Sequence, residues 1–348
     1  MKSVLFVTDA WYPQVNGVVH TLEHTAAELE RRGIEVKYIT PQGFRTLPCP
    51  TYPEIRLSIT TRRILRAMIR EKDCDHIHIA TEGPLGLLAA AAAKKDNRAF
   101  TTSYHTRFPE YVTARVPVPT APFYAWFRRF HNSGSGCMVA TSMLEQSLKS
   151  RNFKNIMRWS RGVDTEVFRP YGESSLPAHL QRPVFMNVGR VSVEKNIEAF
   201  LDLDLPGFKV VVGTGPQIES LRRKYPDVLF TGMKSGEDLA RLYASADCFV
   251  FPSRTDTFGL VLLEALACGV PVAAFPVMGP VDVLGESGAG VLSEDLREAA
   301  LSALKVPTDT CREAALEYSW GRCTDQFLAN IETADRKHRE RLNSRPRG

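Results

Sequence analysis

The sequence lacks a long apolar run, paired cysteines and a strong excess of charge of either sign. Its longest apolar run, 85–93, has about half the length that crosses a bilayer. The apolar residues 4–7 are too few to form the core of a secretory signal peptide. The seven cysteines are scattered without a C-x-x-C pair, which indicates neither a zinc site nor a disulfide framework. We therefore expect a cytoplasmic protein whose thiols are reduced and buried.

The charge balance is mildly basic. With 44 Lys and Arg against 39 Asp and Glu, the net charge of +5 fits an anionic ligand or an anionic membrane surface. It is too small to indicate a nucleic acid partner. A hydrophobic content of 44% and a charged content of 24% are ordinary for a soluble globular protein. The 348 residues predict two domains, each large enough to bury a core.

The stretch 251–269 organises the rest of the chain. It is predicted to contain a strand end, a polar loop and a helix over 260–268. Asp256 lies in the loop and Glu264 in the helix, with seven residues between them. Gly259 stands at the helix start, where free N–H groups and the helix dipole favour an anion. A sugar diphosphate needs both features, donors for phosphate and carboxylates for hydroxyl groups, although a solvated loop Asp and a surface Glu remain the alternative.

The run SRTDTFGLVLLEALACGVPV resembles the E-x7-E element of family four glycosyltransferases, which are retaining enzymes that use nucleotide sugars. The resemblance implies an α/β protein of the GT-B fold, with two Rossmann-like domains and a cleft between them. It implies that Glu264 contacts the donor ribose and Asp256 the hydroxyls of the donor sugar. The family usually has glutamate where this chain has Asp256, which leaves donor choice open. The donor-binding backbone would come from Phe258, Gly259 and Leu260.

A second motif, GRVSVEKN, follows a predicted strand at 184–188. Arg190 and Lys195 in this motif place two cations where a diphosphate carries two negative charges. In the family that the chain resembles, this pair holds the diphosphate and stabilises charge as the nucleotide leaves. A structural role for the pair is the alternative.

Two further segments are assigned to the donor. Gly213 and Gly215 in GTGP follow a predicted strand and allow a close approach of backbone and ligand. By resemblance to the family, Met233 and Lys234 would lie near the nucleobase.

The first half opens with a strand at 4–7, a loop, a helix at 18–32 and a strand at 34–40. This order predicts a parallel sheet with ligands at the carboxyl ends of its strands. The stretch YPQVNGVVHTLEHTAAEL is similar to the opening of the same family, which implies that Asn16 and Gly17 lie against the donor diphosphate and the acceptor. A plain tight turn is the alternative.

His105 is the histidine to which we assign a function. It lies in SYHTRFPEY, directly after a predicted strand at 99–103. The segment resembles the family segment whose histidine contacts the transferred sugar or the reaction centre. Four other histidines of this half have no such context, and we expect structural roles for His20, His24, His76 and His78.

We divide the chain into an acceptor-side Rossmann-like domain over 1–163 and a nucleotide-sugar-binding Rossmann-like domain over 164–319. By resemblance to GT-B proteins, a C-terminal helix at about 320–342 would pack back on the first domain. The final stretch, 336–348, carries six Lys and Arg residues and is predicted to be frayed.

Two segments bear on the acceptor. The predicted helix 61–72 has an apolar face with four arginines on the rest, and 123–131 is rich in aromatic residues beside Arg128 and Arg129. Both patterns fit an anionic membrane surface, while an ordinary surface helix and core packing are the alternatives. We expect a protein that is peripheral on the inner face of the cytoplasmic membrane.

The overall pattern resembles bacterial lipid-directed glucosyltransferases and mannosyltransferases of this family, which implies a hexosyltransferase that uses a UDP- or GDP-hexose donor. The resemblance implies a lipid acceptor such as diacylglycerol or a glycolipid, and we expect no cofactor or metal. A soluble or polysaccharide-precursor acceptor and a non-catalytic nucleotide-binding protein of the same fold are the alternatives. D-x-D matches at 73–75 and 202–204 are too short to indicate a metal site. With no carboxylate placed as a nucleophile, we expect front-face attack, with the leaving phosphate helping to take the acceptor proton. The identity of the nucleotide, the hexose and the oligomeric state stay open.

Overall fold

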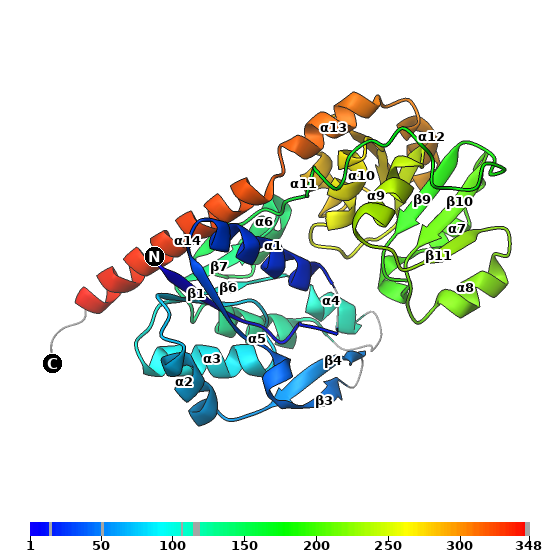
Figure 1. Ribbon diagram of the computed structural model, residues 1–348. Helices are drawn as coiled ribbons and strands as arrows, with labels where there is room; N and C mark the ends of the chain where they lie inside the picture. The colour runs from blue at the N-terminus through cyan, green and yellow to red at the C-terminus, as the bar shows by residue number, and fades with distance from the viewer. Residues whose placement is uncertain (14–15, 50–51, 106, 114–118, 345–348) are drawn as a thin grey trace. The chain divides into compact units, whose positions relative to one another are not determined.

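The computed structural model describes residues 1–13, 16–49, 52–105, 107–113 and 119–344. The chain divides into two compact units (Figure 1). The first unit comprises Met1–Arg161 together with Trp320–Gly348, and the second comprises Gly162–Ser319. Each unit is built on its own six-stranded parallel sheet.

The first unit has a six-stranded parallel sheet in the order β2-β1-β5-β6-β7-β8. Only β1, SVLFV, is close to a continuous apolar run, whereas β5, HIHI, and β6, FTTS, carry buried polar side chains. The strand order reverses between β1 and β5, which makes their carboxyl ends the switch point of this unit. The strands are β1 (Ser3–Val7), β2 (Glu35–Ile39), β5 (His76–Ile79), β6 (Phe100–Ser103), β7 (Gly136–Val139) and β8 (Ile156–Arg158).

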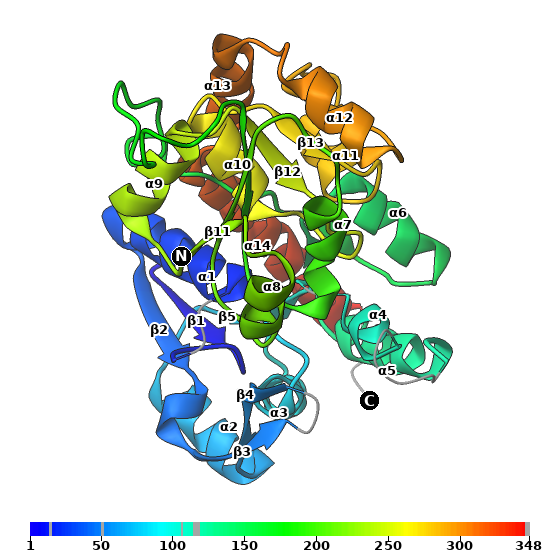
Figure 2. The ribbon, with the colours of Figure 1, turned by 90° about the vertical axis from the view of Figure 1, so that its right-hand side faces the viewer.

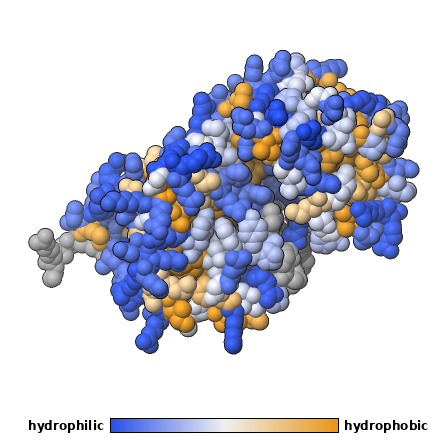
Figure 3. Space-filling view, in the orientation of Figure 1, coloured by the Kyte–Doolittle hydropathy of each residue, from blue (hydrophilic) through white to orange (hydrophobic). Residues whose placement is uncertain are grey.

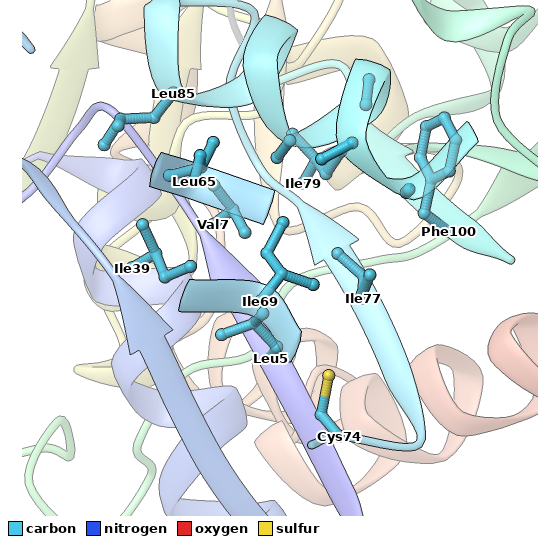
Figure 4. Close-up of a cluster of buried hydrophobic side chains, with 14 of the residues drawn as sticks. Leu5, Val7, Ile39, Leu65, Ile69, Cys74, Ile77, Ile79, Leu85 and Phe100 are labelled. Carbon is cyan, nitrogen blue, oxygen red and sulfur yellow. The ribbon is translucent and has the colours of Figure 1, made fainter. Parts of the chain in front are cut away.

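One face of this sheet is apolar and is covered by α2 and α3. Figure 4 shows the resulting core, in which Leu5 and Ile77 of the strands meet Leu65 and Ile69 of α2. The helices of the unit are α1 (Gly17–Arg31), α2 (Arg62–Glu71), α3 (Pro84–Lys95), α4 (Phe108–Thr113), α5 (Ala121–His131), α6 (Ser142–Ser150) and α14 (Trp320–Asn343).

The opposite face carries polar side chains beneath α14. His76 Nδ1 lies 2.9 Å from Asp335 Oδ1 of that helix, and its Nε2 lies 2.9 Å from Thr101 Oγ1. His78 continues the chain to Thr101 and to Ser103, again at 2.9 Å. Both histidines are therefore structural, as expected. Helix α14 also contacts α1, beside which it lies in Figure 1 and Figure 2.

Asp9 joins the two strands at the switch point of the first unit. Its carboxylate accepts N–H groups of Leu85 and Gly86 at 2.9 and 3.2 Å, at the start of α3. The Thr81 hydroxyl donates to it at 2.9 Å. Burial raises the pKa of Asp9 to about 6, against these hydrogen bonds. Asp9 thus ties the end of β1 to the helix that follows β5.

The second unit repeats this plan with a parallel sheet in the order β11-β10-β9-β12-β13-β14. Its switch point lies between β9 and β12, because the order reverses there. The strands are β9 (Val184–Val188), β10 (Phe208–Val212), β11 (Leu229–Gly232), β12 (Cys248–Phe251), β13 (Val272–Ala274) and β14 (Gly290–Leu292).

Helices cover the sheet of the second unit as well. Residues of α7, α8 and α12 share one apolar cluster with its strands, and α10 contacts α9, α11 and α13. The helices are η2 (Val193–Lys195), α7 (Glu198–Leu201), α8 (Ile218–Lys224), α9 (Gly236–Ala244), α10 (Leu260–Ala267), α11 (Pro280–Leu284), α12 (Leu296–Ala303) and α13 (Thr308–Leu316).

Two features differ from the sequence expectations. A hairpin of β3 (Arg45–Cys49) and β4 (Tyr52–Ile59), preceded by the short helix η1 (Pro41–Gly43), was not predicted. The basic end that was predicted to fray is helical as far as Asn343, because α14 packs on the first unit. Among the described residues, no helix combines the length and apolarity that spanning a membrane requires.

Candidate functional site

The loops that follow β9 and β12 meet at the switch point of the second unit. Lys195 Nζ lies 2.6 Å from Asp256 Oδ1 and 2.8 Å from Oδ2. The two side chains are 28% and 12% exposed. The structure therefore brings together two residues that the sequence analysis had selected from motifs about sixty positions apart. Arg190 belongs to the same loop as Lys195, two residues after β9.

Side chains fasten these two loops to each other. Asn196, in the left-handed conformation with φ 53°, donates from Nδ2 to the carbonyl of Pro252 at 3.0 Å. The hydroxyl of Thr255 donates to the carbonyl of Glu194 at 3.3 Å. Beneath them, Asn187 of β9 donates to the carbonyl of Val250 in β12 at 3.0 Å. The cation and the carboxylate are thus held by a preformed frame.

Gly213 and Gly215 follow β10, the other neighbour of β9. A Cβ at Gly213 would lie 1.9 Å from the carbonyl oxygen of Gly189, and one at Gly215 would lie 2.3 Å from that of Val191. Both positions need glycine because the loop after β9 approaches so closely. The close approach predicted at these glycines is thus one of protein backbone, and nothing in it assigns a ligand contact to them.

The start of α10 has a glycine N-cap, as the sequence predicts. Gly259 is the N-cap with φ 85°, a conformation that glycine adopts without strain, and Leu260 is the first helical residue. The side chain of Phe258 is only 6% exposed and packs edge-on against Tyr318, with ring centroids 6.2 Å apart. The side chain of Phe258 therefore supports the loop from the core, and the donor contact predicted for its backbone stays a prediction.

Glu264 lies one turn into α10 and is partly buried. The hydroxyl of the buried Tyr243 donates to its Oε2 at 3.0 Å. Burial raises the pKa of Glu264 to about 7, and the hydrogen bond from Tyr243 opposes that rise. A carboxyl with such a pKa changes charge near neutral pH.

Met233 and Lys234 are exposed, Met233 to 60%. They follow β11, the edge strand, which is separated from β9 by β10. Their predicted place near the nucleobase stays a prediction.

In the first unit, Asn16 serves the backbone of α1. Its Oδ1 accepts N–H groups of Val18 and Val19 at 2.9 and 3.1 Å, as an N-cap does. Gly17 is the first residue of that helix. Gln14, Val15 and Thr106, which belong to the stretches that carried the predictions for Asn16 and His105, lie outside the described residues.

His105 lies two residues beyond β6 and is partly buried. Arg161 Nη2 donates to its Nδ1 at 3.0 Å. Burial and, next, the charge of Arg161 hold the pKa of His105 well below its usual value. The imidazole is neutral at pH 7.

Sequence reasoning missed three charged residues at the carboxyl ends of strands in the first unit. Asp9 follows β1, and Glu82 follows β5, where it lies 3.0 Å from Nε2 of the buried His131. Arg161 follows β8, near the predicted boundary between the two domains. Position directly after a predicted strand was a usable signal for Asp9 and Glu82. Nothing in the sequence alone indicated the contact of Arg161 with His105.

Within the described residues, no three His, Cys, Asp or Glu side chains are grouped so that they could hold a metal ion. The two D-x-D matches serve other contacts. Asp75 accepts the N–H of Ser3 at 3.2 Å, and Asp202 accepts the hydroxyl of Tyr225.

Comparison with known families gives two matches. A model described as Glycosyltransferase Family 4 matches residues 15–167, and one described as Glycosyl transferases group 1 matches residues 182–306.

Similar proteins cover most of the chain. A GDP-mannose-dependent alpha-mannosyltransferase of Mycobacterium tuberculosis is 30% identical over 314 residues, 83% of each chain. An alpha-monoglucosyldiacylglycerol synthase of Streptococcus pneumoniae is 27% identical over 352 residues, 89% of this chain and 79% of the relative. The structure of a sucrose-phosphate synthase from Thermosynechococcus elongatus is similar over 99% of this chain and 100% of its own, with a TM-score of 0.75 and 19% identity. The last similarity bears on the fold alone.

Proposed function

The chain belongs to glycosyltransferase family 4 and has the GT-B fold, and from this premise we propose that it moves a hexose, with retention of configuration, from a nucleoside diphosphate sugar to a hydroxyl group of a membrane lipid. GDP-mannose is the first donor to test, because the mannosyltransferase that is 30% identical is named for it.

The observation that carries this proposal is the Lys195–Asp256 contact at the switch point of the second unit. Ligands of open parallel sheets bind at such points. A lysine ammonium has three donors, and the two oxygens of Asp256 engage at most two of them. Lys195 thus keeps a donor for a phosphate oxygen, and Arg190 adds a planar, permanently charged group in the same loop. Asp256 orients the lysine and accepts a hydroxyl of the donor sugar.

The chemistry follows from these charges. The bond from the anomeric carbon to the diphosphate oxygen breaks, and Lys195 and Arg190 stabilise the negative charge that develops on that oxygen. The acceptor oxygen attacks from the same face and its proton passes to the departing phosphate, so that configuration is retained. Because both oxygens of Asp256 contact Lys195, this carboxylate is a poor covalent nucleophile, which supports attack without a glycosyl-enzyme intermediate.

Glu264 is assigned to the donor ribose. In its ionised form the carboxylate accepts two hydroxyl hydrogen bonds in addition to that from Tyr243. With a pKa of about 7 in the free protein, Glu264 would release its proton as these bonds form.

A membrane acceptor is supported by the name of the diacylglycerol-glucosylating relative and by a surface of the first unit, which we term the hairpin patch. Figure 3 shows apolar side chains among strongly polar ones along the lower edge, over α2 and the β3–β4 hairpin. The apolar residues are Leu47, Ile59 and Ile64, which are 58%, 56% and 51% exposed. The exposed cations beside them in the chain are Arg45, Arg62 and Arg63. Cations among apolar side chains suit a peripheral site on the anionic inner face of the cytoplasmic membrane.

The structure limits which predicted membrane residues are available. Arg66 and Arg70 both bind Asp96, which caps α3; Arg66 is only 24% exposed, whereas Arg70 stays 59% exposed. The aromatic segment forms α5, whose Tyr124 and Phe127 are buried while Trp126 is 43% exposed. Core packing therefore accounts for most of that segment.

A donor and acceptor screen tests the proposal. Purified protein is mixed with GDP-mannose or UDP-glucose and with diacylglycerol in anionic vesicles, and released nucleotide and new glycolipid are measured. Lys195→Ala should abolish the product. Lys224→Ala, which removes an exposed lysine of the same unit that also pairs with a carboxylate, should leave it unchanged.

Each other outcome decides between the alternatives. Transfer to a soluble sugar without vesicle binding would replace the lipid acceptor by a soluble one. Nucleotide binding with no transfer to any acceptor would contradict the enzymatic proposal and favour a non-catalytic protein of the same fold.

A further inference from the structure

Arg161 is a buried arginine without an acidic partner among the residues that the structure describes. Only 5% of it is exposed. Its guanidinium donates to the carbonyls of Trp159 and Ser160 at 2.7 and 2.8 Å, and to Nδ1 of His105 at 3.0 Å. Burial lowers its pKa to about 10, so the group is still cationic at neutral pH. A buried charge with no counter-ion is costly, which points to a use for it.

The contact with His105 fixes where the imidazole carries its proton. A guanidinium donates hydrogen bonds and cannot accept them. Nδ1 of His105 must therefore hold a lone pair, and since the ring is neutral its proton lies on Nε2. The ring of Trp159 maintains this arrangement, with the guanidinium carbon of Arg161 4.8 Å from its centroid and the imidazole edge-on at 5.9 Å.

The C-terminal helix holds this assembly in place. Ser160 donates its N–H to Oε1 of Gln326 at 2.8 Å, and its carbonyl accepts the thiol of Cys323 at 3.1 Å. The ring of Trp159 packs on Phe327 with centroids 4.9 Å apart. Arg161 is thus supplied by a rigid segment rather than by a loose connection between units.

We infer that Arg161 is a positioning residue that locks His105 as the Nε2–H tautomer, so that the imidazole carries a hydrogen-bond donor at Nε2 and does not act as a general base there. Its consequence for catalysis rests on the proposed function and on the family resemblance, which assigns the histidine of this segment to the transferred sugar. It agrees with a reaction in which the leaving phosphate, and no histidine, takes the acceptor proton.

The tautomer can be read directly by nitrogen NMR of the full-length protein labelled with ¹⁵N-histidine. Signals of His105 are assigned as those absent from His105→Asn. We expect one neutral tautomer with Nε2 protonated, unchanged between about pH 6 and 9. Arg161→Met should give a mixture of tautomers and a raised pKa, because both the donor and the charge are lost. Arg161→Lys should keep the wild-type pattern.

The inference is overturned if wild-type His105 is protonated at Nδ1, or if its signals are the same in Arg161→Met. The wild-type spectrum alone decides the tautomer should Arg161→Met fail to fold, which a melting curve detects. This readout needs no transfer activity, so the inference and the proposed function can fail separately.

Kinetics add the second test. Arg161→Met should lower kcat by about tenfold, the range of one lost hydrogen bond, while the affinity for GDP or UDP stays within about twofold. Arg161→Lys should recover most of kcat. Equal losses in both variants would contradict a positioning role, since lysine keeps the donor and the charge.

Discussion

Asp256 and Lys195 neutralise each other before any donor arrives, and this pairing changes what a substitution at either residue does. Removal of Asp256 leaves Lys195 cationic and able to bind phosphate, whereas removal of Lys195 takes away a phosphate ligand. Substitution of Asp256 should therefore affect mainly turnover, whereas substitution of Lys195 should also weaken donor binding.

Asp256→Ala should lower the transfer rate by about a hundredfold, the effect of losing one preorganised contact in the transition state. Nucleotide affinity should change by less than about threefold, because Lys195 and Arg190 remain. Initial rates and calorimetric titration with the nucleotide measure the two quantities. Glu198→Ala, which removes the acidic partner of the exposed Lys224, is the matched control. Wild-type turnover in Asp256→Ala would show that Asp256 does not contact the sugar.

Glu264 should make nucleotide binding depend on pH. Its pKa is raised from 4.5 to about 7 by burial, so the carboxyl is largely protonated at pH 6 and largely ionised at pH 8. Since the ionised form accepts the ribose hydroxyls, affinity should rise over this interval. Glu264→Gln should be weaker and independent of pH in titrations at pH 6, 7 and 8. A wild-type affinity that stays flat would remove Glu264 from the ribose contact.

The same shift predicts an effect on stability. A raised pKa means that the folded protein binds a proton more tightly than the unfolded chain does. The stabilisation is complete below the unfolded pKa of 4.5 and is lost as pH rises through about 7. Glu264→Gln should therefore flatten the fall in unfolding free energy between about pH 5 and 8. An unchanged slope would contradict the raised pKa.

At the level of single elements, the predictions that succeeded rest on patterns within one segment. The first strand and the helix before Gly269 follow from local apolar runs and a glycine cap. The hairpin of β3 and β4 has no tight-turn signature, so it was missed. The packing of the Phe258 side chain against Tyr318 joins residues sixty positions apart, which no local pattern reveals. The contact between Arg161 and His105 joins the loops that follow β8 and β6, and no local pattern predicts it either.

The loop after β10 gives a prediction at this scale. Gly215→Ala should lower the unfolding free energy by roughly 1–3 kcal/mol, because its Cβ would overlap the carbonyl of Val191. Gly172→Ala has no atom within 4 Å of the added Cβ and should be neutral or stabilising by up to about 1 kcal/mol. Urea denaturation followed by far-UV circular dichroism measures both. Equal unfolding free energies of the two variants would mean that the loop after β9 can shift away from the added Cβ without destabilising the fold.

At the scale of the whole molecule, the second unit is one continuous segment, while the first unit is closed by the last helix. All four tryptophans, residues 11, 126, 159 and 320, lie in the first unit. Tryptophan fluorescence therefore follows the unfolding of the first unit alone, whereas nucleotide binding measures whether the second unit is folded.

Phe327→Ala tests this division. Phe327 is fully buried and packs on Phe6, His78 and Trp159, so its loss should cost about 3–5 kcal/mol. The fluorescence transition should move to lower denaturant while nucleotide affinity stays unchanged. Leu316→Ala, at a position of α13 that is 49% exposed, should move neither. A parallel loss of nucleotide binding in Phe327→Ala would mean that the second unit depends on the first for its fold.

The place of α14 in the chain also sets the order in which the protein can fold during synthesis. When the ribosome has completed Arg161, the sheet of the first unit is present, but the helix that covers its polar face and Trp159 is not. The second unit is then made in full and has every residue that its own sheet needs. At synthesis rates of 5–20 residues per second, the polar face of the first sheet stays uncovered for roughly 10–40 s, the time that synthesis of the second unit and α14 takes. We expect the nascent chain to carry a folded second unit and an unfinished first unit through this interval, when protection by a chaperone matters most.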